Sequence, residues 1–145
     1  MDGKVISINT SETKGVRKKP VDEVIFIEDF GIEGDAHASG KWHRQVSLLA
    51  LESIRKMQDM GLDVGPGDFA ENITTEGLDL PSLPIGTRML LGGNIEGEVS
   101  QIGKVCHDRC AIYEQAGDCV MPREGIFIRI IRGGRLSRGD SVRTV

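Results

Sequence analysis

Aromatic residues and long apolar runs are both scarce in this chain. Its 145 residues include only four Phe, one Tyr and one Trp. No stretch approaches the ~20 apolar residues that span a bilayer, and the opening MDGKVISINT is too polar for a signal peptide. The sequence therefore predicts a cytoplasmic, reducing location and no membrane partner.

An excess of positive charge is also missing. The chain has 18 Lys and Arg against 22 Asp and Glu, a formal net charge of -4. A nucleic-acid-binding domain would show a basic footprint, so no nucleic-acid partner is predicted. The basic run Arg17–Lys19 is interpreted as a solvated face, because the basic residues of this chain are interleaved with acids and glycines.

Cysteine occurs only three times, and all three residues fall between Gly103 and Gly125. In a reducing compartment they are expected to be free thiols or metal ligands. Their odd number leaves at least one outside any intramolecular pair. The segment therefore needs an explanation of its own.

Glycine, by contrast, is abundant, with 19 residues among many short apolar runs. This pattern favours a mainly β, barrel-like fold in one domain over residues 1–145. One main helix is predicted from Leu48 to Met60, where apolar residues recur every three or four positions, with Ser47 as cap and Gly61 as stop. A short helix is expected at 111–116. Strands are predicted at residues 4–11, 24–27, 72–75, 87–91, 95–102 and 126–131, with a last strand after Asp140.

Three interpretations of the cysteine segment compete. A structural zinc site at Cys106, His107, Cys110 and Cys119 is disfavoured, because two close pairs of ligands are the usual spacing. A redox disulfide is disfavoured by the absence of Cys-x-x-Cys. A single activated thiol at Cys110 is favoured, since Arg109 and a helix start both stabilise a thiolate.

Two other segments suit an anion. GDAHASGKWHRQVSLL places His37, Lys41, His43 and Arg44 just before the predicted helix, where they can converge near its N-terminus. GDFAENITTEG offers Gly67, Asn72 and Thr74. Arg123 is a further candidate anion clamp near the cysteines. The plainer alternative is that Asp35 and Asp68 simply cap turns.

Taken together, three long motifs resemble the MOSC domain, the module named for the C-terminal part of molybdenum cofactor sulfurase. They are GIEGDAHASGKWHRQVSLLALESI, GDFAENITTEGLDLPSLPIGTRMLLG and SQIGKVCHDRCAIYEQAGDCVMPREGIFIRIIRGGRLSRGD. The resemblance implies a β-barrel of the MOSC, or PK-barrel, type and a role in molybdenum cofactor chemistry. It also implies a cysteine ligand for molybdenum, best matched by Cys110, with Cys106 as the alternative.

The sequence therefore predicts that the domain binds molybdenum cofactor (molybdopterin), or molybdate or tungstate, with a Cys110 thiolate as ligand. The chain has no aminotransferase-like domain, so it is not expected to bind pyridoxal phosphate by itself. A sulfur carrier with a persulfide on Cys110 is the alternative function. A molybdoenzyme or a cofactor-biosynthesis protein is the expected partner. The predicted cofactor-binding residues are His37, Lys41, Arg44, Asn72, Lys104, Arg109 and Arg123.

Overall fold

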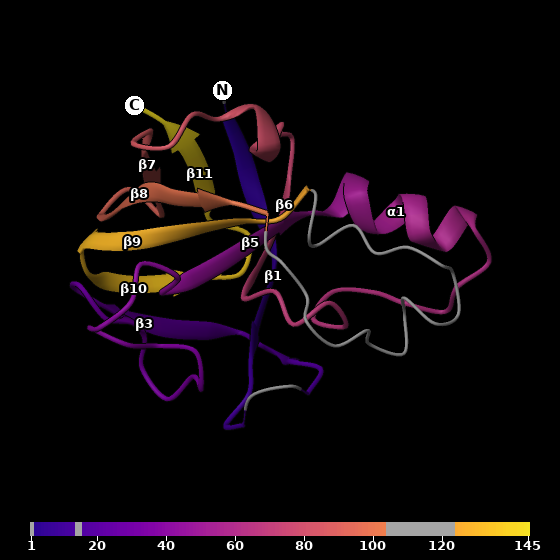
Figure 1. The fold of residues 1–145 in the computed structure, drawn as a ribbon, viewed down its shortest axis with the longest axis horizontal. Helices are drawn as coiled ribbons and strands as arrows, with labels where there is room; N and C mark the ends of the chain where they lie inside the picture. The colour runs from indigo at the N-terminus through magenta and orange to yellow at the C-terminus, as the bar shows by residue number, and fades with distance from the viewer. Residues whose placement is uncertain (1, 14–15, 104–123) are drawn as a thin grey trace.

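A closed seven-stranded β-barrel forms the body of the protein (Figure 1). The computed structural model describes residues 2–13, 16–103 and 124–145. Around the barrel the strand order is β11-β7-β8-β9-β5-β6-β1, and a β1–β11 pairing closes it. The barrel strands are β1 (Asp2–Thr10), β5 (Val46–Ala50), β6 (Ile73–Glu76), β7 (Arg88–Leu91), β8 (Ile95–Ile102), β9 (Ile126–Arg132) and β11 (Ser141–Thr144).

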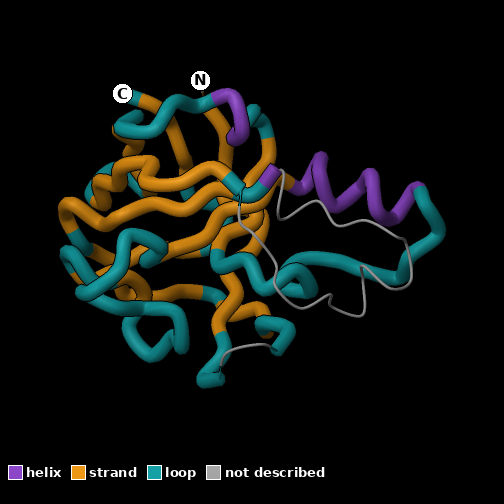
Figure 2. Tube along the Cα trace, in the orientation of Figure 1, coloured by secondary structure: helices purple, strands orange, loops and turns teal. Residues whose placement is uncertain are grey.

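Four further strands and two helical elements complete the described fold. Strand β2 (Lys19–Val21) adds to β1, while β3 (Glu23–Ile27), β4 (Gly31–Ile32) and β10 (Gly134–Ser137) form a second sheet in the order β10-β3-β4. Helix α1 (Leu51–Asp59) extends to one side of the barrel, and a 3-10 turn, η1, spans Leu80–Ser82 (Figure 2). No helix among the described residues has the length and apolar character needed to cross a membrane.

Strand β8 shows why the sequence forms a barrel. Ile95 and Val99 are wholly buried and belong to the main core, whereas Glu96 and Glu98 between them are partly exposed. Gly97 takes an inward position where a Cβ would lie 2.8 Å from the Ile128 Cδ1 atom of β9. Alternation with a period of two buries one face of each strand, and closure gives these faces a common interior.

The main helix is shorter than the sequence pattern predicts. Residues Val46–Ala50 form a fully buried strand, and α1 begins only at Leu51. Leu48 faces the barrel core, whereas Leu49 packs in a second cluster with Ile54 of α1. Because both faces of β5 are covered, its residues are apolar apart from Ser47, and their sequence resembles the apolar stripe of a helix. Ala50, rather than Ser47, is the N-cap residue, with no side-chain bond.

The parallel pair β5–β6 explains the position of α1. The other strand pairs among the described residues are antiparallel, but parallel neighbours need a crossover, and α1 provides it. The mainly β class is confirmed, and the strands predicted at 95–102 and 126–131 match β8 and β9 closely. The short helix predicted at 111–116 lies outside the described residues. The extent of a single domain over 1–145 stays a prediction.

Candidate functional site

The cysteine segment begins and ends at one corner of the barrel. Gly103, at the end of β8, donates its backbone N–H to the carbonyl oxygen of Gly125, which precedes β9, at 2.6 Å. On the far side of the segment, Glu124 accepts hydrogen bonds from Ser53 Oγ at 2.7 Å and Lys56 Nζ at 2.9 Å of α1. The described residues around this corner therefore surround the two ends of the cysteine segment, which are called its base below.

Seven of the predicted residues belong to the segment itself. They lie outside the described residues, so their predicted roles stay predictions: Lys104, Cys106, His107, Arg109, Cys110, Cys119 and Arg123.

The loop before β5 is tied to this corner. His43 Nε2 lies 2.7 Å from Gln101 Oε1, and Gln101 Nε2 donates to the Gly103 carbonyl oxygen at 2.7 Å. Ser100 Oγ donates to the backbone carbonyl of His43. The loop therefore lies against the end of β8, next to the place where the cysteine segment starts.

Arg44 is held between two aromatic rings in this loop. Its guanidinium carbon lies 4.8 Å from the ring centroid of Trp42 and 5.5 Å from that of Phe127. The Nε atom is buried and has no hydrogen-bond partner among the described residues. An unpaired buried N–H costs about 1–3 kcal/mol, so this donor suits an acceptor supplied from outside the fold.

Lys41 lines a shallow hollow beside Arg44. The hollow has a volume of about 420 Å³. Asp29 and Arg129 in its wall form an ion pair at 3.2 Å, while the side chain of Trp42 is half exposed. The hollow thus offers cationic donors and one aromatic face. Its lining residues are Asp29, Gly40, Lys41, Trp42, His43 and Arg129.

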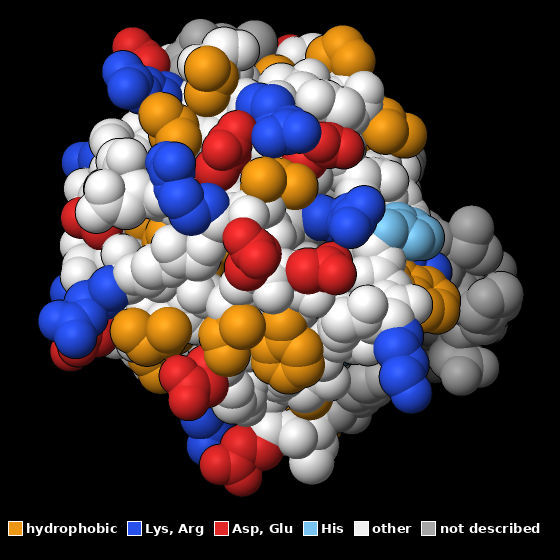
Figure 3. All heavy atoms as spheres, turned by 90° about the vertical axis from the view of Figure 1, so that its left-hand side faces the viewer, with side chains coloured by type: hydrophobic (Ala, Val, Ile, Leu, Met, Phe, Trp, Pro, Cys, Tyr) orange, Lys and Arg blue, Asp and Glu red, His pale blue; other side chains and the backbone are white. Residues whose placement is uncertain are grey.

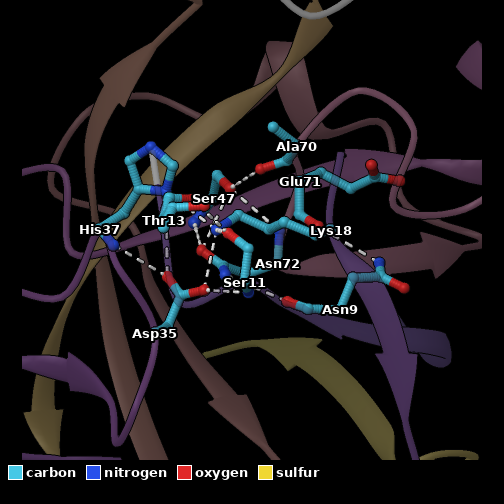
Figure 4. A network of polar contacts seen from close by, with 10 residues as sticks. All are labelled: Asn9, Ser11, Thr13, Lys18, Asp35, His37, Ser47, Ala70, Glu71 and Asn72. Atoms are coloured by element: carbon cyan, nitrogen blue, oxygen red, sulfur yellow. Dashed lines mark hydrogen bonds and ion pairs between the residues drawn. The ribbon is translucent and has the colours of Figure 1, made fainter. Parts of the chain in front are cut away.

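His37 lies elsewhere, in an ionic cluster (Figure 4). Lys18 Nζ, whose side chain is wholly buried, lies 2.8 Å from Asp35 Oδ1 and 2.9 Å from His37 Nδ1. Burial alone would raise the pKa of Asp35, but the hydrogen bond from Lys18 and that from the Ser11 backbone outweigh it, and the pKa is lowered. The Asp35 carboxylate is therefore held in its ionised form inside the protein.

The second predicted anion segment contains its own anion. Glu71 is fully buried, and its Oε1 accepts the backbone N–H groups of Gly67 at 3.0 Å and Phe69 at 3.3 Å. Thr74 Oγ1 donates to its Oε2 at 2.8 Å. Desolvation outweighs these three bonds and raises the pKa of Glu71 to about 7. The backbone amide and hydroxyl expected to receive a ligand are thus occupied by a carboxylate of the same chain.

Asn72, which directly precedes β6, bonds to strands β5 and β1 of the barrel. Its Oδ1 accepts from the Ser47 backbone N–H at 3.0 Å, and its Nδ2 donates to the Asn9 carbonyl oxygen at 3.2 Å. The side chain is buried with these partners, which gives it a structural role. The prediction that Asn72 orients a bound group stays a prediction.

The structure separates residues that the sequence pattern groups together. Lys41 lines the hollow, Arg44 lies in the same loop against Trp42, His37 belongs to the ionic cluster, and all three precede β5 rather than a helix. The interpretation of the basic run as solvated is wrong for Lys18, whose side chain is wholly buried, and right for its exposed neighbours. No local pattern marks Lys18 as buried, because its partners follow 17 and 19 residues later.

Charges of both signs cover the face of the barrel shown in Figure 3. Acidic and basic side chains are interspersed there, around a small apolar group. Within residues 2–13, 16–103 and 124–145, no three His, Cys, Asp or Glu side chains converge in a way that could hold a metal ion.

Comparison with known proteins gives one family match and several structural ones. The model of the MOSC domain family matches residues 35–143. A search of curated proteins gives no significant match. The crystal structure of the YuaD protein from Bacillus subtilis superposes with a TM-score of 0.76 at 21% identity, covering 98% of this chain and 94% of that one.

Two further crystal structures are similar. YiiM from Escherichia coli gives a TM-score of 0.71 at 19% identity, covering 100% of this chain and 70% of that one. YiiM from Geobacillus stearothermophilus gives 0.71 at 20% identity, covering 99% and 75%. At these sequence identities, the structural similarity shows that the three proteins share the fold of this chain.

Proposed function

The chain belongs to the MOSC domain family, and on this premise we propose that it binds molybdenum cofactor, or a molybdenum or tungsten oxyanion, beside the base of the cysteine segment. The MOSC family is associated, in general, with the chemistry of molybdenum cofactor. The metal ligand in this proposal is the Cys110 thiolate, because molybdenum in such cofactors favours soft sulfur donors.

The observation that carries the proposal is the unpaired donor of Arg44. Its Nε is buried without a partner among the described residues, while the guanidinium is fixed by Trp42 and Phe127. A rigid, partly desolvated guanidinium binds oxyanions strongly, because its planar N–H groups match two oxygens at once. The phosphate of the pterin and the oxygens on the metal both offer such acceptors.

The described residues fit the anionic part of this ligand. Arg44 would hold an oxygen in place, and Lys41 would add a second positive charge from the neighbouring hollow. Phe127 and Trp42 would keep water away from the guanidinium, which strengthens its hydrogen bonds. When bound, the group would supply a redox-active metal centre.

Metal analysis of the purified protein tests the proposal directly. The full chain, produced in a host supplied with molybdate, is expected to contain stoichiometric molybdenum and pterin, or to bind added molybdate in calorimetry. Arg44→Met keeps much of the aliphatic contact with the two rings but removes the donors. It is expected to weaken binding about 10- to 100-fold, the loss of a charged hydrogen bond worth about 1.5–3 kcal/mol.

Arg135→Met is the matched control, because Arg135 is an exposed arginine on β10, the strand that pairs with β3 outside the barrel. Its affinity for molybdate is expected to equal that of the wild type. Stoichiometric binding of neither metal, pterin nor molybdate by the folded wild type would contradict the proposal. A mass increase of one sulfur atom that disappears in Cys110→Ala would instead support the sulfur carrier.

A further inference from the structure

Trp42 is the only tryptophan of the chain, and it is half exposed in the hollow that Lys41 also lines. Two neighbouring side chains hold its ring in place. The ring stacks on that of His43, with the centroids 5.7 Å apart and the planes 16° apart, and the Arg44 guanidinium carbon lies 4.8 Å from the Trp42 centroid. A large apolar ring is thus presented to the solvent in a fixed orientation.

His43 is itself anchored to the end of β8. Gln101 Nε2 donates to the Gly103 carbonyl oxygen at 2.7 Å, and Gln101 Oε1 lies 2.7 Å from His43 Nε2. An amide oxygen can only accept, so His43 Nε2 is the donor of this bond. The stack of Trp42 on His43 is therefore a preorganised flat surface. Such a surface suits a planar ring, because stacking on an aromatic side chain tolerates many heterocycles and costs little when the side chain is already ordered.

Asp29 places an oriented acceptor in the same hollow. Its Oδ1 accepts from Gln45 Nε2 at 2.9 Å and from Arg129 Nη2 at 3.2 Å. These two bonds lower the pKa of Asp29, so the group is a carboxylate at neutral pH. Its backbone is fixed as well, because the Asp29 N–H donates to the Ile130 carbonyl oxygen at 2.7 Å. Oδ2 has no hydrogen-bond donor among the described residues, so this oxygen can accept from a ligand.

Lys41 supplies the opposite charge. Its backbone N–H donates to Ser39 Oγ at 3.2 Å, whereas its ammonium group forms no ion pair with the described residues. The volume of the hollow, about 420 Å³, falls in the range of about 300–1,000 Å³ that is usual for sites of small organic molecules. A single tetrahedral oxyanion would leave most of this space empty, and the Asp29 carboxylate would repel it.

We propose that the hollow binds a planar nitrogen heterocycle that carries an anionic group. The ring stacks on Trp42, an N–H on the edge of the ring donates to Asp29 Oδ2, and the anionic group, such as a phosphate, pairs with Lys41. Two sources have this chemistry: a free purine nucleotide, and the heterocycle of the cofactor in the proposed function. Only the second source rests on that function, because none of the three contacts needs a metal.

The fluorescence of Trp42 provides the first test, on the wild-type protein. Because the chain has no other tryptophan, quenching of this signal reports on stacking at this one ring. Adenosine monophosphate is the probe for a free nucleotide, and neopterin phosphate is the probe for the pterin. Saturable quenching by either probe supports the proposal and identifies the source, and quenching by both shows that the shared chemistry is what the hollow recognises. If neither probe gives saturable quenching at millimolar concentration, the proposal is overturned.

Asp29→Asn tests the acceptor. The variant keeps an oxygen for Gln45 and Arg129 but offers the ligand an N–H instead of Oδ2, so the dissociation constant of the bound probe is expected to rise about tenfold. Glu28→Gln is the matched control, because Glu28 is the exposed neighbour of Asp29 and does not line the hollow. Its dissociation constant is expected to equal that of the wild type. Equal affinities of the two variants for the probe would contradict the role of Asp29.

A ligand analogue tests the same bond from the other side. If adenosine monophosphate binds, its analogue with two methyl groups on the exocyclic amino nitrogen keeps the ring and the phosphate but loses the N–H donors. We expect this analogue to bind the wild type about tenfold more weakly, and to bind Asp29→Asn as well as the parent nucleotide does. An analogue that binds the wild type as tightly as the parent nucleotide would refute the proposed bond to Asp29.

Titration with molybdate separates this inference from the proposed function. If the wild type binds no molybdenum, pterin or molybdate, the proposed function fails, but quenching by adenosine monophosphate still decides whether the hollow takes a heterocycle. If molybdate binds and its affinity depends on Arg44, while neither heterocycle quenches Trp42, the proposed function stands and the inference about the hollow fails.

Discussion

The buried carboxyl group of Glu71 makes the stability of this protein depend on pH in an unusual direction. Desolvation raises the pKa of Glu71 from 4.5 to about 7 in the folded state, although three hydrogen bonds oppose it. A carboxyl group whose pKa is raised by folding contributes most to stability at pH values below the pKa that it has in the unfolded state. That contribution is lost as the pH rises from 4.5 to about 7.

The magnitude follows from that interval. At about 1.4 kcal/mol per pH unit, ionisation of the buried group removes about 3 kcal/mol of the free energy of unfolding. Glu71→Gln keeps the size of the side chain and cannot ionise. Its Oε1 can accept the same two backbone N–H groups, and its amide can donate to Thr74 Oγ1. The free energy of unfolding of the variant, relative to that of the wild type, is therefore expected to rise by about 3 kcal/mol between pH 4.5 and pH 8.

Urea unfolding followed by circular dichroism, at half-unit steps of pH, measures this difference. Glu28→Gln is the control, because Glu28 is exposed at the end of β3 and its neutralisation should leave the pH profile nearly parallel to that of the wild type. Asp35 does not interfere, since a lowered pKa acts only below about pH 4. If the difference in the free energy of unfolding between the wild type and Glu71→Gln stays constant with pH, or changes in the opposite direction, the reasoning is refuted.

Two further changes test the fold. Gly67→Ala is expected to destabilise by about 2 kcal/mol or more, because Gly67 has a φ of +88° and a Cβ would lie 2.3 Å from the Lys18 carbonyl oxygen; Gly65→Ala, with open space around it, should stay within about 1 kcal/mol of the wild type. Leu48→Ala is expected to cost about 2–5 kcal/mol and Leu51→Ala clearly less, since only Leu48 lies in the barrel core. Equal losses at the two leucines in thermal or urea unfolding would instead favour the continuous helix.

Where one side of a strand is covered, the sequence is a good guide to the fold. In β8 the alternation of Ile95 and Val99 with Glu96 and Glu98 indicates both that the segment is a strand and which of its faces points inward. In β5 two cores remove the alternation, and only the tertiary structure shows that Leu48 and Leu49 point to opposite sides. Local pattern therefore fails where burial is complete on both faces.

The candidate site follows the same rule. The exposed loop of Lys41 and Arg44 is visible as a cluster of basic residues in the sequence. The unpaired Nε of Arg44 is not, because it depends on Trp42 and on Phe127, which lies on another strand. Lys18 looks like an ordinary surface lysine for the same reason: the groups that neutralise it come from another segment.

Closure of the barrel by the β1–β11 pair has a consequence for synthesis in the cell. β1 is the first barrel strand to leave the ribosome and β11 the last, so the register Asp2↔Arg143 and Lys4↔Ser141 cannot form until β11 has emerged. Until then β1 lacks its β11 neighbour, and so does β7. Open strand edges of this kind attract other chains. The nascent protein is thus exposed to aggregation until β11 emerges, and a chaperone would protect it best during that interval.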